Sequence, residues 1–390
     1  MKRSFLTAAM AASLVVSAGA VPVAAQDALE GDLTLWHTYS SGAGTELDAL
    51  NAVLANVAAA NPGLNVEVLE VPFGDVFNKW QLEVASGEGP DLMIVPNDSL
   101  GQLTRDGLIA DITDMVPAEA LAELSQLSID GSSVDGRLMQ VPESLKAVAM
   151  YYNKDKVATP PATTDELLAA VEGGLKLGLL QGIYHNFGFA GAFGGSLMDA
   201  DGKCTADAGG FAEALQFLAD LKAAGAVIDP SYDNMANGLK DGTYDAIIDG
   251  PWAAGGYAAA VPNLGVAAMP AGPAGPSLPF AGVDGWLINP NGNMELAVKA
   301  ALAMTSAENQ KIFADTAFHI PANTTIAIDD PISAQFATAV AEGFPRPQSA
   351  QFGAFWGPFG DALNKVLDGG MAPADAIAEA CVAMNAANGF

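Results

Sequence analysis

The chain has 390 residues, enough for two or more packed lobes, because a single hydrophobic core stops growing near about 250–300 residues. Apolar residues make up 51% and charged residues 16%, the composition of an ordered globular protein. The formal net charge of −29 at pH 7 opposes binding to nucleic acid and to anionic lipid, so both are excluded as partners.

The first 25 residues have the pattern of a secretory signal peptide. Lys2 and Arg3 give a basic start, an apolar run covers 5–20, and small residues lead to a cleavage point after Ala25. No cysteine lies near that point, so a lipid anchor is not indicated. No later run reaches the ~18 apolar residues that a membrane span needs. We expect an exported, soluble protein that is periplasmic or extracellular.

Strands and helices alternate through the first part of the mature chain. The pattern predicts strands at 31–37 and 64–71 and helices at 45–60 and 77–85. The segment 91–95 is almost wholly apolar, which is typical of a parallel strand that is covered on both faces. Strands separated by helices predict a βαβ architecture.

The rest of the chain continues this α/β pattern without an internal repeat. Strands are predicted at 138–142, 147–152, 244–248, 264–268 and 284–289. Helices are predicted at 164–176, 211–224, 295–305, 307–316, 333–342, 351–367 and 373–387. This order predicts two α/β lobes connected by strands, with helices concentrated at the C-terminal end.

The stretch 245–252, Asp-Ala-Ile-Ile-Asp-Gly-Pro-Trp, combines a short buried strand with an abrupt end. Gly250 and Pro251 break the strand, because glycine tolerates unusual dihedrals and proline has no N–H for the ladder. Trp252 follows at once, at the end of a strand, where open α/β sheets present groups that contact ligands. A core tryptophan under a helix would fit these residues as well.

Cys204 and Cys381 are the only cysteines in the chain. In an oxidising compartment they favour a single disulfide, although two free buried thiols would also fit. The histidines, His37, His185 and His319, share no ligand spacing with one another or with the cysteines. We therefore expect no metal site and no cofactor.

Several segments together resemble the maltose- and maltodextrin-binding proteins of ABC importers, within the extracellular solute-binding family. The similarity runs from about Gly31 to the C-terminus, and its specificity lies in the order and spacing of the segments. They are the entry strand with Trp36, Gly89-Pro-Asp-Leu-Met-Ile-Val95, Asp98 followed by 107–112, Val141-Pro142, Tyr152-Asn-Lys-Asp155 with Pro160-Pro161, Gly250-Pro-Trp252, Phe280-Ala-Gly-Val283 and Ala354-Phe-Trp356.

The resemblance implies the two-lobed periplasmic binding protein fold of class α/β, with a ligand cleft between the lobes and a hinge of three crossings. The crossings would fall near 142–147, 281–286 and 328–333. Each of them carries Pro, Gly or a strand end, and hinge closure needs only a few residues to change their dihedrals. The lobes would be 27–144 plus 283–331 for the N-lobe and 145–282 plus 332–390 for the C-lobe.

The resemblance also implies a binding protein and not an enzyme. Such a protein closes over maltose, maltodextrin or a related α-linked oligosaccharide and delivers it to a membrane-embedded permease. A monomer is expected.

Sugar rings present apolar faces and rims of hydroxyls, so a sugar site needs aromatic platforms together with placed donors and acceptors. Trp252 and Trp356 match the stacking aromatics of the family's C-lobe, and Tyr184 falls close to another. The chain is shorter than the family pattern around Tyr184, so Phe187 or His185 could take that place.

The resemblance names further candidates on the N-lobe and at the hinge. Asp98 matches a carboxylate that accepts hydrogen bonds from sugar hydroxyls, although a solvated loop residue or a helix N-cap would also fit. Trp36 matches a tryptophan of the entry strand and could equally belong to the core. Asp284, at the second crossing, could be a ligand acceptor or could cap a turn.

The chain departs from the family pattern mainly on the N-lobe. Val95 stands where maltose binders carry a tryptophan, and Ser41 and Ser99 replace a lysine and an arginine that contact sugar. Lys146 aligns with a carboxylate, for which Glu143 could compensate. The C-lobe platform is kept better than the N-lobe polar set, so sugar binding is expected while the identity of the sugar stays open.

Three alternatives remain. The ligand could be another disaccharide, such as trehalose or sucrose. Asp98, Glu143 and Asp284 could supply the carboxylate pair of a glycosidase, although the sequence holds no Gly-x-Ser-x-Gly motif. The acidity would also suit a binder of cations or polyamines. The affinity for such a ligand would fall steeply with salt, whereas the affinity for a stacked neutral sugar would be almost independent of salt.

Overall fold

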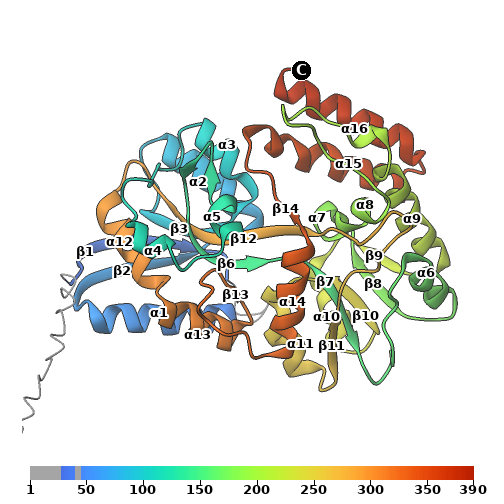
Figure 1. Ribbon diagram of the computed structural model, residues 1–390, viewed down its shortest axis with the longest axis horizontal. Coiled ribbons are helices and arrows are strands. Elements are labelled where there is room, and N and C mark those ends of the chain that lie inside the picture. The colour runs from blue at the N-terminus through green and yellow to red at the C-terminus, as the bar shows by residue number, and fades with distance from the viewer. Residues whose placement is uncertain (1–27, 40–44) are drawn as a thin grey trace, which may run out of the picture.

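The structure is a computed structural model that describes residues 28–39 and 45–390. The predicted signal peptide over 1–25 and Ser41 lie outside the described residues. Two β-sheets organise the fold, and Figure 1 shows the lobes built on them side by side, with β12 running from one toward the other.

The N-lobe is built on a seven-stranded sheet with the strand order β13-β6-β12-β3-β1-β2, in which β14 also pairs with β12. β1 is parallel to β2 and β3, while β12 is antiparallel to β3 and β6. The strands are β1 (Glu30–His37), β2 (Gly63–Glu70), β3 (Leu92–Pro96), β6 (Val141–Lys146), β12 (Phe280–Ile288), β13 (Ile320–Pro321) and β14 (Phe344–Pro345).

Strand β3 is buried on both faces of this sheet, as its apolar run predicts. Leu92 and Ile94 pack into a cluster with α1 (Glu46–Ala60), α12 (Met294–Met304) and α13 (Ala307–Ala317). Met93 and Val95 point the other way, into a cluster with α2 (Phe73–Ala85) and α3 (Leu100–Arg105). Shorter elements complete the lobe: η1 (Asn97–Ser99), α4 (Ala118–Leu121), α5 (Gln126–Gly131), β4 (Ser133–Val134) and β5 (Arg137–Leu138).

The C-lobe is built on a five-stranded sheet with the order β11-β7-β10-β8-β9. β8 is parallel to β9 and β10, and β7 is antiparallel to β10 and β11. The strands are β7 (Ala149–Asn153), β8 (Leu177–Leu180), β9 (Val227–Asp229), β10 (Ala246–Asp249) and β11 (Leu264–Ala267).

Helices cover both faces of the C-lobe sheet. One core cluster joins Ala246 and Ile248 of β10 to α6 (Thr164–Glu172), α9 (Phe211–Ala224), α15 (Trp356–Leu367) and α16 (Pro373–Asn388). The opposite cluster joins Ile247 to α10 (Tyr232–Lys240), α11 (Ala254–Ala260) and α14 (Pro331–Glu342). The remaining helices and turns are α7 (Ile183–Asn186), α8 (Gly188–Ala192), η2 (Ala206–Ala208), η3 (Pro251–Ala253) and η4 (Ala350–Phe355).

The chain passes between the two sheets at short segments. Ala147 and Val148 separate β6 of the first sheet from β7 of the second, and β12 begins beside β14 before it pairs with β6 and β3. Helix α14 lies between the lobes and contacts β6 and β12 as well as β7 and β11. The segment 143–146, which the sequence predicts as a connection, is part of β6.

A disulfide joins Cys204 to Cys381 and thereby ties the loop after α8 to helix α16. The amide of Cys204 also donates to Oδ1 of Asn385, at 2.8 Å. Across 28–39 and 45–390, no helix has the length and apolarity that crossing a membrane requires.

Candidate ligand-binding site between the lobes

Aromatic rings from the C-lobe and charged side chains from both lobes meet at the junction of the two sheets. Tyr184 lies at the centre of the rings, with its centroid 6.1 Å from that of Trp252 and 6.4 Å from that of Trp356. The structure thus brings together the three aromatic residues that the sequence singles out as sugar platforms.

Trp252 is held in place by the turn that ends β10. Pro251 starts the turn, and a methyl group added at Gly250 would overlap the indole ring. The indole Nε1–H donates to the hydroxyl of Tyr232, at 2.9 Å. The ring therefore has a glycine beneath it and one polar anchor inside the protein, and it is only partly buried.

Trp356 opens helix α15 and reaches the N-lobe. Its indole Nε1–H donates to the main-chain oxygen of Asp98, at 3.2 Å. Tyr184 differs from both tryptophans, because its buried hydroxyl has no hydrogen-bond partner among the described residues. Burial raises the pKa of Tyr184, although Arg346 and Lys146 oppose this shift, so the hydroxyl keeps its proton at neutral pH.

Asp98 is paired with an arginine that the sequence analysis missed. The buried Arg346 donates from Nη1 to the carboxylate of Asp98 and to Oδ1 of Asn97, the latter at 2.9 Å. Its guanidinium carbon lies 5.3 Å from the ring centroid of Tyr184 and 6.0 Å from that of Trp356. The sequence feature that could have pointed to Arg346 is its place between two prolines, in a chain with only 16 lysines and arginines.

Asp284 is paired with Lys146, which stands where the family pattern has a carboxylate. Nζ of Lys146 lies 2.7 Å from Oδ1 of Asp284 and 5.4 Å from the ring centroid of Trp252. Burial alone would lower the pKa of Lys146, but Asp284, Tyr184 and Asp98 together outweigh it and raise the pKa. Lys146 is therefore a cation that links β6 and β12 to the aromatic cluster.

Glu143 does not join this cluster, contrary to the suggestion that it compensates for Lys146. Its side chain is fully buried and its Oε2 lies 2.9 Å from Nδ1 of His319, whose Nε2 lies 3.0 Å from Oε1 of Glu46. Two carboxylates accept from one ring, so both ring nitrogens donate and His319 is an imidazolium. Burial would lower the pKa of His319, but Glu143 and Glu46 outweigh it and raise the pKa to about 10.

Trp36 and Phe187 belong to the interior. Trp36 is 5% exposed and packs edge-on against Trp80 of α2, so it forms N-lobe core. Phe187 is also 5% exposed and stacks on Phe280 with centroids 3.6 Å apart. His185 is buried with its Nε2 3.3 Å from Oδ1 of Asp249, which leaves Tyr184 as the residue that faces both tryptophans.

Two of the departures on the N-lobe have a simple structural account. Val95 is 2% exposed and fills the core cluster beneath α2 and α3. Ser99 ends the turn η1, one residue after Asp98, and is partly exposed. The cations near Asp98 and Asp284 therefore come from other parts of the chain, namely Arg346 and Lys146.

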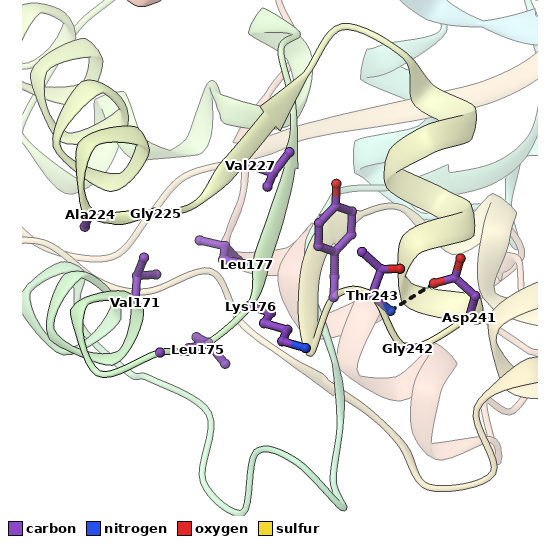
Figure 2. A pocket seen from close by; sticks show the side chains of 12 residues that line it. Val171, Leu175, Lys176, Leu177, Ala224, Gly225, Val227, Asp241, Gly242 and Thr243 are labelled. Atoms are coloured by element: carbon purple, nitrogen blue, oxygen red, sulfur yellow. Dashed lines mark hydrogen bonds between the residues drawn. The ribbon is translucent and has the colours of Figure 1, made fainter.

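A separate depression of about 690 Å³ lies on the C-lobe and shares no residue with the junction cluster. Figure 2 shows its lining, in which Lys176 and Leu177 lie across from Thr243 and its hydrogen-bond partner Asp241. It lacks the group of several aromatic rings with paired charges that the junction has. Within the described part of the chain, no group of three or more His, Cys, Asp and Glu side chains could hold a metal ion.

Residues 52–340 match the family model described as bacterial extracellular solute-binding protein. The chain belongs to that family. A family relative, the maltooligosaccharide ABC transporter solute-binding lipoprotein of Streptococcus pneumoniae, is 28% identical over 75% of this chain and 75% of its own. The galactooligosaccharide-binding protein of Bacillus subtilis is 26% identical over 87% of this chain and 89% of its own.

A solved structure of the Thermus thermophilus maltotriose binding protein, bound with maltotriose, is 28% identical and has a TM-score of 0.81. The match covers 91% of this chain and 100% of that one. The predicted resemblance and the two-lobed periplasmic binding protein fold are thereby confirmed. These relatives are named as binding proteins and not as enzymes.

Proposed function

We propose that this protein is the solute-binding component of an ABC importer and that it captures a neutral α-linked oligosaccharide between its lobes. The observation that carries the proposal is the junction cluster, in which Tyr184, Trp252 and Trp356 surround paired charges. Flat rings suit the apolar faces of a sugar, and charged donors and acceptors suit its hydroxyls. The names of the relatives, which include maltooligosaccharide- and maltotriose-binding proteins, support the same class of ligand.

In this proposal the two tryptophans act through their faces. Each indole N–H is already bound within the protein, by Tyr232 for Trp252 and by the main chain of Asp98 for Trp356. Hydrogen bonds to the sugar come instead from Tyr184 and from the polar side chains Asp98, Arg346, Lys146 and Asp284. Trp36, Glu143 and Phe187 support the site only from the interior.

The segments between the sheets are the proposed hinge, with the N-lobe as 27–144 plus 283–331 and the C-lobe as 145–282 plus 332–390. Contacts between α3 and η4, and between α13 and α11, join the lobes on either side of the cluster. We propose that these contacts belong to the closed, ligand-holding arrangement. The protein would act as a monomer outside the cytoplasm, after cleavage of its signal peptide, and would deliver the sugar to a membrane permease.

The rival functions fit the geometry less well. A glycosidase needs an acid and a base, but Asp98 and Asp284 each face a cation and Glu143 faces His319. A binder of cations or polyamines needs carboxylates that are free of a cation partner in the protein, whereas Asp98 is paired with Arg346 and Asp284 with Lys146.

Isothermal calorimetry against maltose, maltotriose, trehalose, sucrose and cellobiose tests the proposal and ranks the sugars. We expect α-linked sugars to bind with an affinity that changes little between low and high salt. A protein that binds none of them, or whose affinity falls steeply with salt, contradicts the proposal. We expect no enzyme activity, so the appearance of new reducing ends after incubation of the protein with maltodextrin would contradict the proposal.

A further inference from the structure

A buried carboxylate lies directly behind the Trp252 platform. Asp249 is the last residue of β10, is fully buried, and receives four donors. Its Oδ1 accepts from the amide of Gly250 at 2.8 Å and faces Nε2 of His185 at 3.3 Å. Its Oδ2 accepts from the hydroxyls of Tyr232 at 3.0 Å and Tyr257 at 2.5 Å. A carboxylate has about four acceptor positions, so this one is fully used.

The carboxylate sets the direction of the hydrogen bonds that lead to the indole. An ionised carboxylate only accepts, so the single proton of Tyr232 is committed to Asp249. The oxygen of Tyr232 is then free to act as an acceptor, and it receives the N–H of Trp252 at 2.9 Å. Burial and the charge of Asp249 raise the pKa of Tyr232, so its hydroxyl keeps the proton that this direction requires.

The floor beneath the ring is fixed as well. The hydroxyl of Tyr151 donates to the carbonyl oxygen of Gly250 at 2.9 Å, and the indole lies against Gly250. His185, which also faces Asp249, packs edge-on against the indole with centroids 6.0 Å apart. The hydrogen bond from the indole N–H to Tyr232 therefore sets the orientation of the Trp252 ring on Gly250.

We propose that Asp249 and Tyr232 are positioning residues of the ligand site: they hold the Trp252 ring in the orientation that a sugar stacks on. This inference rests on the proposed function, because it assigns a ligand role to Trp252. It predicts that the contribution of Tyr232 to affinity passes through the indole N–H and not through the general stability of the lobe.

A double-mutant cycle on sugar affinity separates these two routes. Tyr232→Phe leaves the N–H of Trp252 without its acceptor, and we expect roughly tenfold weaker binding of the tightest sugar. Trp252→Phe keeps a ring but has no N–H, so adding Tyr232→Phe to it should change affinity by less than about twofold. Equal losses in the two backgrounds overturn the proposal, because they mean that Tyr232 acts independently of the indole.

The indole N–H signals of the ligand-free protein give a readout that needs no sugar. The chain has 5 tryptophans, and the Trp252 signal in a ¹⁵N–¹H spectrum is the one that Trp252→Phe removes. We expect Tyr232→Phe and Asp249→Asn to shift this signal, because both disturb the acceptor. Tyr257→Phe is the control: it removes a different donor to Asp249 and should leave the Trp252 signal at its wild-type position. If Tyr232→Phe leaves the Trp252 signal at its wild-type position, the proposed role of the hydrogen bond to Tyr232 is overturned.

The two proposals fail in distinguishable ways. A wild-type protein that binds no oligosaccharide overturns the proposed function and the ligand role of Asp249, even if the Trp252 signal shifts as expected. A wild-type protein that binds sugar, with a Tyr232→Phe variant that binds it equally well, overturns the positioning role alone.

Discussion

The buried ion cluster of Glu46, His319 and Glu143 makes the stability of the protein depend on pH in a defined direction. The pKa of His319 is about 10 in the folded protein, against 6.5 for an unperturbed histidine. A group whose pKa is raised by folding stabilises the protein fully below its unfolded pKa. That stabilisation is lost as the pH rises through the folded pKa. The loss should therefore fall between pH 6.5 and about 10.

The magnitude follows from the size of the shift. A rise from 6.5 to about 10 corresponds to about 5 kcal/mol at most, since one pKa unit is worth about 1.4 kcal/mol. By the same linkage, about 4 kcal/mol of this should disappear between about pH 7 and pH 10. His319→Gln removes the charge and leaves the buried carboxylate of Glu143 without a cation, which destabilises the variant at neutral pH.

Urea unfolding of the wild type and of His319→Gln, at pH steps from neutral to alkaline, measures the effect. The difference in unfolding free energy between the two should shrink steadily as the pH rises. His37→Gln is the control, because burial lowers the pKa of His37 and it is neutral throughout this range. A difference for His319→Gln that stays constant would refute the reasoning, since it would mean that folding does not hold a proton on His319.

Three further predictions concern the site, the hinge and the C-terminal helices. Trp252→Ala should weaken sugar binding by at least about tenfold in calorimetry, whereas Trp36→Phe, in the core, should leave it unchanged. Gly101→Ala places a methyl group against the backbone that leads into η4, so the lobes should close less fully. We expect weaker sugar binding and, in X-ray scattering of the protein with ligand, a larger radius of gyration than for the wild type. Replacing Cys204 and Cys381 by serine opens a link across 177 residues and should cost up to about 5 kcal/mol in chemical unfolding.

The elements that the sequence predicts correctly are those whose signal is local. The apolar run 91–95 predicts a strand covered on both faces, and β3 is such a strand, with Leu92 and Met93 in different core clusters. The break at Gly250-Pro251 likewise predicts a tryptophan presented at a strand end. Each of these patterns depends on neighbours in the chain and needs no knowledge of the partner element.

The predictions that failed depended on partners that are distant in the chain. The segment 143–146 contains Glu, Ser and Lys, so its pattern indicates a connection, yet it is a strand whose charges are matched by Asp284 and His319. Arg346 lies 248 residues from Asp98, and no local pattern reports that pairing. A polar residue in the interior becomes predictable only when its partner is known, because burial requires that partner.

Under the proposed function, this pairing of charges would explain how an acidic protein holds a neutral ligand. Of the charged groups at the junction, Asp98 is matched by Arg346 and Asp284 by Lys146, so these pairs carry no net charge. The overall charge of −29 therefore lies mainly elsewhere, where it opposes association with other acidic surfaces. At the junction, the matched pairs offer donors and acceptors in fixed positions next to three aromatic rings. Under the proposed function, such a site would distinguish ligands by the arrangement of their hydroxyls and apolar faces, which is what recognition of an uncharged oligosaccharide requires.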